Sequence, residues 1–147
     1  MTWKQLLAEG RVERLPSKAE EIRELCALAE RSLTDACVDG LSIDGKYGFA
    51  YAAARALATA VVRAAGYRVR SHGGGHYNTF LALQAVDMRL FDWFGEFFNL
   101  CREKRNELSY ESAGIVSDLE AEELVLEVSK FSILAGRWLR SRRIESS

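Results

Sequence analysis

An alanine-rich stretch at residues 44–65 constrains the fold of this chain more than any other feature. Alanine is the strongest helix former, and the stretch ends at Gly66, a residue that commonly stops a helix. So many small side chains allow neighbouring helices to approach closely from more than one side. We therefore expect this segment to form the central and most buried helix of the domain.

Apolar residues recur at helical spacing in most of the remaining chain. The corresponding helices are expected at residues 2–9, 17–38, 76–88, 90–108 and 117–138. Ser17 and Ser117 each precede a glutamate by three residues, which predicts a capping box at the start of two of them. Apart from a brief stretch at residues 67–70, no segment alternates as a strand would. The sequence predicts one all-α domain over residues 1–147, an up-and-down bundle of four long helices plus a short N-terminal helix.

Charge and cysteine content exclude several broad classes of protein. Twenty basic and twenty-one acidic side chains give a net charge of −1, so a nucleic-acid role would need a local basic patch. Cys26, Cys37 and Cys101 are odd in number and widely spaced, which favours reduced core thiols over disulfides or a zinc site. Neither a signal peptide nor a membrane-spanning stretch is evident. We expect a cytoplasmic protein with no membrane contact, no metal and no cofactor.

The end of the helix at residues 90–108 is a candidate anion site. Arg102 and Arg105 are three residues apart, and Asn106 and Ser109 share their side of the helix. Guanidinium groups gathered in this way can bind an anion such as phosphate. Arginines in the last turns of a helix also complement its negative dipole end without binding anything. The sequence leaves both interpretations open.

A second polar row lies on the central helix, where Tyr47, Tyr51 and Arg55 follow one another at spacings of four residues. These side chains could line a groove or an interface. Tyrosines that lie partly in a core with a solvated hydroxyl group are equally familiar, and we favour that second interpretation.

The glycine-rich loop at residues 66–75 precedes a helix that opens with His76. Three consecutive glycines suit a flexible turn at least as well as an anion cradle, and the lysine of a P-loop is absent. His72 and His76 have the spacing of helical metal ligands, but the glycines between them interrupt any helix. At a helix amino end, His76 would favour its neutral form and could accept a proton.

Aromatic residues surround much of the helix at residues 90–108, including Phe91, Trp93, Phe94 and Phe97. One face of a bundle needs less apolar surface than this. We expect the surplus to form the seam of a homodimer.

Several of these features resemble the HEPN superfamily of small helical proteins of bacteria and archaea. They are the order of the helices, the closure of the central helix at Gly66-Tyr67, the loop from His72 to Tyr77 and, above all, Arg105-Asn106-Glu107-Leu108-Ser109-Tyr110. The resemblance covers residues 17–138. HEPN proteins typically carry an arginine, a polar residue, three variable positions and a histidine near the end of a long helix. Many are metal-independent ribonucleases that act as toxins or defence effectors, often as dimers with one shared cleft.

The resemblance implies that Arg105 and Asn106 are catalytic, but Tyr110 occupies the position of the motif histidine. A phenol, with a pKa of about 10, is a poor base, whereas an imidazole with a pKa of about 6.5 can both accept and donate a proton. Losing one such partner typically costs a hundredfold to about ten-thousandfold in rate. Tyr110 could still donate a hydrogen bond or a proton, and His72 or His76 could supply the missing imidazole.

We therefore favour a non-catalytic or weakly active dimer of the toxin-antitoxin or defence type that binds RNA, a nucleotide or a partner protein such as a nucleotidyltransferase. One alternative is a metal-independent endoribonuclease that uses Arg105, Asn106 and Tyr110. Another is a structural dimerisation module in which the same polar residues fix the register of two subunits.

Overall fold

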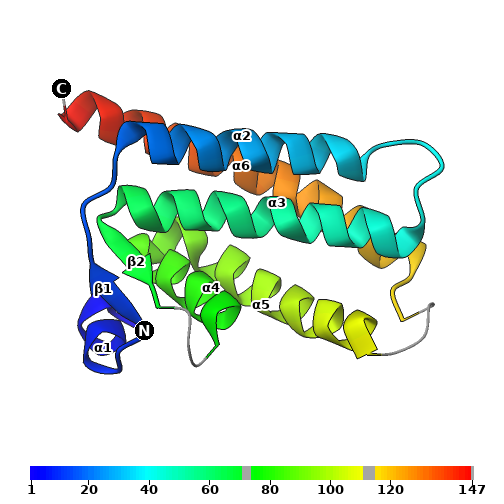
Figure 1. Ribbon diagram of the computed structural model, residues 1–147, viewed down its shortest axis with the longest axis horizontal. Helices are drawn as coiled ribbons and strands as arrows, with labels where there is room; N and C mark the ends of the chain where they lie inside the picture. Colours follow the sequence, from blue (N-terminus) through cyan, green and yellow to red (C-terminus); the bar gives the residue numbers. More distant parts are fainter. Residues whose placement is uncertain (71–73, 111–114, 147) are drawn as a thin grey trace.

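The computed structural model describes residues 1–70, 74–110 and 115–146, and Figure 1 shows their arrangement. Its elements are α1 (Trp3–Ala8), β1 (Val12–Arg14), α2 (Ala19–Ala36), α3 (Ile43–Ala64), β2 (Tyr67–Val69), α4 (Gly75–Val86), α5 (Met88–Tyr110) and α6 (Asp118–Ser146). The predicted all-α bundle of four long helices with a short N-terminal helix is confirmed. The shorter α4 completes the described part of the chain, together with two strands of three residues each.

Helix α3 lies at the centre, as its alanine content predicts. It packs against α2 on one side and against α4, α5 and α6 on the others. Ala50, Ala54, Ala58 and Val61 have no solvent exposure, so the small side chains allow the close packing of several helices that the sequence suggested. This position lets side chains of α3 meet residues of α4 and α5, which is where the candidate site forms.

A small antiparallel ladder joins the N-terminal segment to the bundle. Val12 lies opposite Val69, and Arg14 lies opposite Tyr67. Trp3 of α1 stacks on Tyr67 of β2 with ring centroids 3.7 Å apart, so α1 packs against this ladder. The sequence predicted the extended stretch at residues 67–70 but not its partner strand.

The two predicted capping boxes have different outcomes. At α6, the Glu120 amide donates to Ser117 Oγ at 3.1 Å and the Ser117 amide donates to Glu120 Oε1 at 3.0 Å, so that box is confirmed. The box at Ser17 is wrong, because α2 starts only at Ala19 and its N-cap is Lys18, with no side-chain cap.

The expectation of three core thiols is wrong for Cys37. Cys101 is buried and Cys26 is half-buried, but Cys37 is exposed. The reason is that α2 ends at Ala36, so Cys37 lies at its C-cap, beyond the face that packs on α3. None of the three cysteines forms a disulfide bond. Within the described ranges, no helix is long and apolar enough to cross a membrane.

Candidate functional site

Three helices each contribute a polar side chain to one point on the bundle. The Tyr51 hydroxyl of α3 lies 3.1 Å from Nδ1 of His76, which is in the first turn of α4. The guanidinium carbon of Arg105, on α5, lies 5.2 Å from the centre of the Tyr51 ring. Tyr51 is buried and the other two residues are half-buried, so the cluster opens to solvent on one side.

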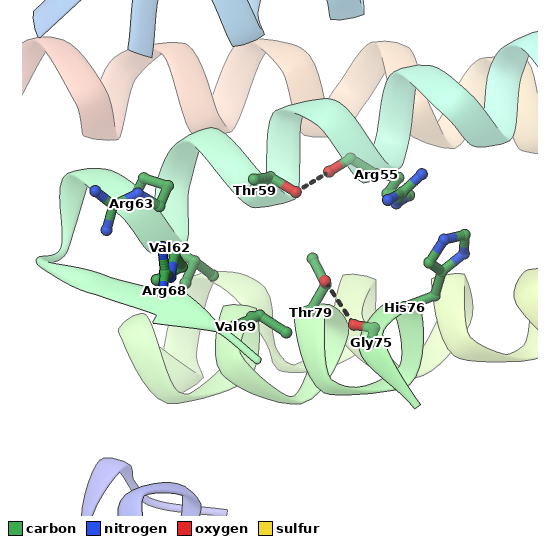
Figure 2. Close-up of a pocket in the computed structure, with 9 residues that line it drawn as sticks. All are labelled: Arg55, Thr59, Val62, Arg63, Arg68, Val69, Gly75, His76 and Thr79. Carbon is green, nitrogen blue, oxygen red and sulfur yellow. Dashed lines mark hydrogen bonds between the residues drawn. The ribbon is translucent and has the colours of Figure 1, made fainter. Parts of the chain in front are cut away.

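The glycines before α4 place His76 at this point. Gly74 is the N-cap of α4 and has a φ of 96°, a left-handed conformation that glycine adopts without strain. The helix can therefore start at Gly75, and His76 projects from its first turn toward α3, as Figure 2 shows.

Burial and nearby cations lower the pKa of His76 below its usual value. Burial makes the largest contribution, followed by the charges of Arg55, Arg105 and Arg102. Each of these causes disfavours the imidazolium form of His76. No carboxylate among the described residues contributes an opposing shift that would raise the His76 pKa. The imidazole is therefore neutral near neutral pH, although it lies in a positively charged environment.

The Tyr51 phenol stays protonated because burial raises its pKa to about 12, against the opposing charges of Arg105, Arg55 and Arg102. Its hydrogen bond with His76 has two forms. If Tyr51 donates to Nδ1, the neutral ring carries its proton on Nε2 and can donate to an anion. If Nδ1–H donates to the phenol oxygen, Nε2 is an acceptor and can serve as a base.

Tyr77 adds an aromatic ring beside the cluster. The guanidinium carbons of Arg102 and Arg11 lie 5.4 and 5.7 Å from its ring centre, within cation–π range. Arg102 also donates from Nε to Asn99 Oδ1 at 3.3 Å, and Arg11 donates to Asn78 Oδ1 at 2.7 Å. These contacts hold two guanidinium groups at the solvent edge of α4, and neither Arg11 nor Tyr77 was singled out from the sequence.

A cleft of about 360 Å³ extends from His76 between α3, α4 and β2 (Figure 2). Its lining residues are Arg55, Thr59, Val62, Arg63, Arg68, Val69, Gly75, His76 and Thr79. Figure 2 shows the Arg55 side chain and the His76 ring approaching each other at one end of the cleft. A ligand in the cleft would therefore meet a guanidinium from α3 and an imidazole from α4 together.

The arginines that line the cleft differ in their availability. Arg63 is buried and bound to the Glu21 carboxylate at 2.6 Å and to the carbonyl oxygens of Leu15, Pro16 and Tyr67. These bonds tie the N-terminal segment to α3, and the sequence pattern gave no sign of them. Arg68 pairs with Glu13.

Arg55, in contrast, is exposed and forms no ion pair within the part of the chain that the structure describes. Among the cationic side chains of this cleft, its guanidinium is the one oriented toward His76 without a carboxylate to neutralise it. It is therefore the group best suited to receive an incoming anion.

The other residues predicted for the site lie elsewhere or cannot be placed. Tyr47 is 3% exposed and donates its hydroxyl hydrogen to the Cys101 carbonyl at 3.2 Å, so it ties α3 to α5 inside the core. Burial raises its pKa well above the usual value. Asn106 is exposed on α5. Ser109 and Tyr110 belong to α5, but their side chains lie outside the described residues, as does all of His72.

The structure thus brings together five of the predicted residues, which are Tyr51, Arg55, His76, Arg102 and Arg105. We call them the arginine cluster. No group of three or more His, Cys, Asp or Glu side chains within the described ranges could hold a metal ion. Comparison with protein-family models, curated proteins and solved structures finds no match to this chain.

Proposed function

We propose that this protein is a HEPN-like binding module that holds the phosphate of an RNA or a nucleotide at the arginine cluster. The observation that supports this proposal is geometric. His76 contacts the Tyr51 hydroxyl, the Arg105 guanidinium carbon lies 5.2 Å from the Tyr51 ring centre, and the Arg55 side chain approaches the His76 ring (Figure 2). The charges of these two arginines and of Arg102 lower the pKa of His76. The protein as a whole carries no excess of positive charge, so a local concentration of guanidinium groups is what a phosphate ligand would require.

Phosphate matches the chemistry of these side chains. Guanidinium groups form short, charge-assisted and often bidentate hydrogen bonds with phosphate oxygens. A neutral imidazole with its proton on Nε2 adds another donor and no charge. Tyr51 holds the ring in place through the 3.1 Å contact with Nδ1. The ligand would then supply a counter-charge to Arg55, which forms no ion pair within the part of the chain that the structure describes.

Salt-dependent binding of a short single-stranded RNA, measured by fluorescence anisotropy, tests the proposal. Arg55→Ala should weaken binding. It should also reduce the magnitude of the slope of log affinity against log salt concentration by about one, which is the contribution of one phosphate contact. Arg31→Ala is the matched control, because Arg31 is an exposed arginine on α2, which packs on another side of α3. Equal losses in both variants would show that binding is non-specific and would refute the proposal.

The neutral His76 also favours a second candidate function, metal-independent cleavage of RNA. In the tautomer with Nε2 unprotonated, the ring could take the proton of a 2′-hydroxyl as the 2′-oxygen attacks the adjacent phosphorus and Arg105 stabilises the phosphorane charge. The P–O5′ bond then breaks, which leaves a 2′,3′-cyclic phosphate, and the departing 5′-oxygen takes the proton back from the imidazolium. His76 would then supply the imidazole that the Tyr110 position lacks.

Incubation of the protein with labelled total RNA in EDTA tests this second function. His76→Ala should abolish cleavage while its circular dichroism spectrum stays that of the wild type, and Arg105→Ala should reduce the rate strongly. Full cleavage by the His76 variant would eliminate this role. Binding without any turnover by the wild type would support the binding module instead.

A further inference from the structure

Helix α6 carries apolar side chains on two opposite faces. Its inner face packs Leu124, Val128 and Phe131 into the core, with at most 1% exposure. Its outer face carries Leu119, Leu126 and Ile133, whose exposed fractions are 82%, 54% and 59%. Their spacing of seven residues places them in one row along the helix. A solvent-facing row on a long helix is ordinarily polar, so three large apolar residues in register indicate a partner surface.

The charges of α6 are divided between its two halves. Residues 118–129 carry only acidic charges, at Asp118, Glu120, Glu122, Glu123 and Glu127. Residues 130–143 carry only basic charges, at Lys130, Arg137, Arg140, Arg142 and Arg143, and Glu145 follows near the end of the helix. A helix with this distribution complements a reversed copy of itself and repels a parallel copy.

We propose that the outer face of α6 binds the α6 helix of a second copy of this chain in antiparallel orientation, about a twofold axis next to Ser129 and Lys130. This register places Leu126 beside Ile133 of the partner subunit and Glu122 beside Arg137 of the partner subunit. Because a twofold interface repeats every contact, each apolar pair and each charge pair occurs twice.

The neighbouring residues fit such a seam. Ser129 and Gly136 follow Leu126 and Ile133 by three residues, so small side chains lie beside the apolar row and allow a close approach. From Leu119 to Arg140 the row extends over about 30 Å of helix, at about 1.5 Å per residue. In Figure 1, α6 lies behind α2 and α3. The cleft is lined by residues of α3, β2 and α4. The pairing leaves the arginine cluster open in both subunits.

The exposed aromatic face of α5, where the sequence suggested a homodimer, is the rival surface. Trp93 and Leu100 are 54% and 61% exposed. Trp93, however, already stacks on Phe97 of its own helix, with ring centroids 5.0 Å apart. The exposed area of Trp93 is therefore smaller than that of an isolated tryptophan. Unlike α6, helix α5 does not separate its acidic residues from its basic residues along its length. Trp93 offers a matched control residue.

Light scattering after size-exclusion chromatography, with sedimentation equilibrium for the dissociation constant, tests the α6 seam on the full chain. The wild type should be a dimer, Ile133→Ser should shift it to monomer, and Trp93→Ser should leave the dimer intact. A monomeric wild type would overturn the proposal. So would a Trp93→Ser monomer together with a dimeric Ile133→Ser variant, because the seam would then lie on α5.

Charge reversal at Arg137 provides a second measurement, because Arg137 is exposed, whereas Glu122 also pairs with Lys46 of its own subunit at 2.7 Å. Arg137→Glu should raise the dissociation constant of the dimer about tenfold or more, because it sets two like-charged pairs across the interface. An unchanged dissociation constant would refute the antiparallel register. Circular dichroism of each variant confirms that the helices are intact.

Discussion

Gly95 lies where α5 packs closely against Phe80 and Gln84 of α4, and its replacement tests that contact. A Cβ atom added at Gly95 would lie 2.8 Å from the carbonyl oxygen of Phe80 and would collide with the side chain of Gln84. The Phe80 oxygen belongs to the main chain of α4 and cannot rotate away. Gln84 could move only by giving up the 2.9 Å hydrogen bond that its Nε2 donates to the Asp92 carbonyl.

The magnitude follows from two opposing contributions. Alanine stabilises a helix by about 0.5–1 kcal/mol relative to glycine. Overpacking in a tightly packed interior costs about 1–3 kcal/mol. Gly95→Ala should therefore lower the free energy of unfolding by up to about 2.5 kcal/mol in urea denaturation followed by circular dichroism. It should also weaken phosphate binding, because α4 carries His76 and would move away from Arg105.

Gly48→Ala is the control for helix propensity, because a Cβ at Gly48 in α3 would meet no atom within 4 Å. It should raise the free energy of unfolding by about 0.5–1 kcal/mol. The difference between the two variants isolates the packing cost, about 1–3 kcal/mol. Equal stabilisation by both substitutions would contradict the close packing of α4 on α5.

Two further predictions concern ionisation. The hydrogen bond from Arg63 lowers the pKa of Glu21 below 4.5, so this carboxylate contributes stability above its usual pKa, and that contribution is lost as the pH falls through the lowered value. Glu21→Gln should therefore flatten the acid side of a plot of unfolding free energy against pH, and an unchanged slope would argue against the pair. Phosphate bound at the arginine cluster should offset the guanidinium charges and raise the pKa of His76, measured by NMR titration with and without inorganic phosphate. An unchanged His76 pKa at saturating phosphate would place the ligand elsewhere.

Most of the fold could be predicted from local sequence patterns. Alanine content marked α3 as the central helix, and Ser117 with Glu120 marked the start of α6, because helix packing and capping depend on residues a few positions apart. The strand at residues 12–14 could not be predicted, because three residues carry too little periodicity and their partner lies more than fifty positions away. The exposure of Cys37 was also missed, since it depends on where α2 leaves its neighbour.

For the candidate site, the sequence alone determined which residue types gather on each helix. It placed Arg102 and Arg105 on one side of α5, and Tyr51 and Arg55 on one face of α3, because the helical repeat fixes which neighbours share a face. Only the tertiary structure decided that His76 meets Tyr51, that Tyr47 faces the core and that Arg63 is committed to Glu21. Those contacts depend on how three helices dock, and docking is set by the packing of buried side chains across the whole bundle.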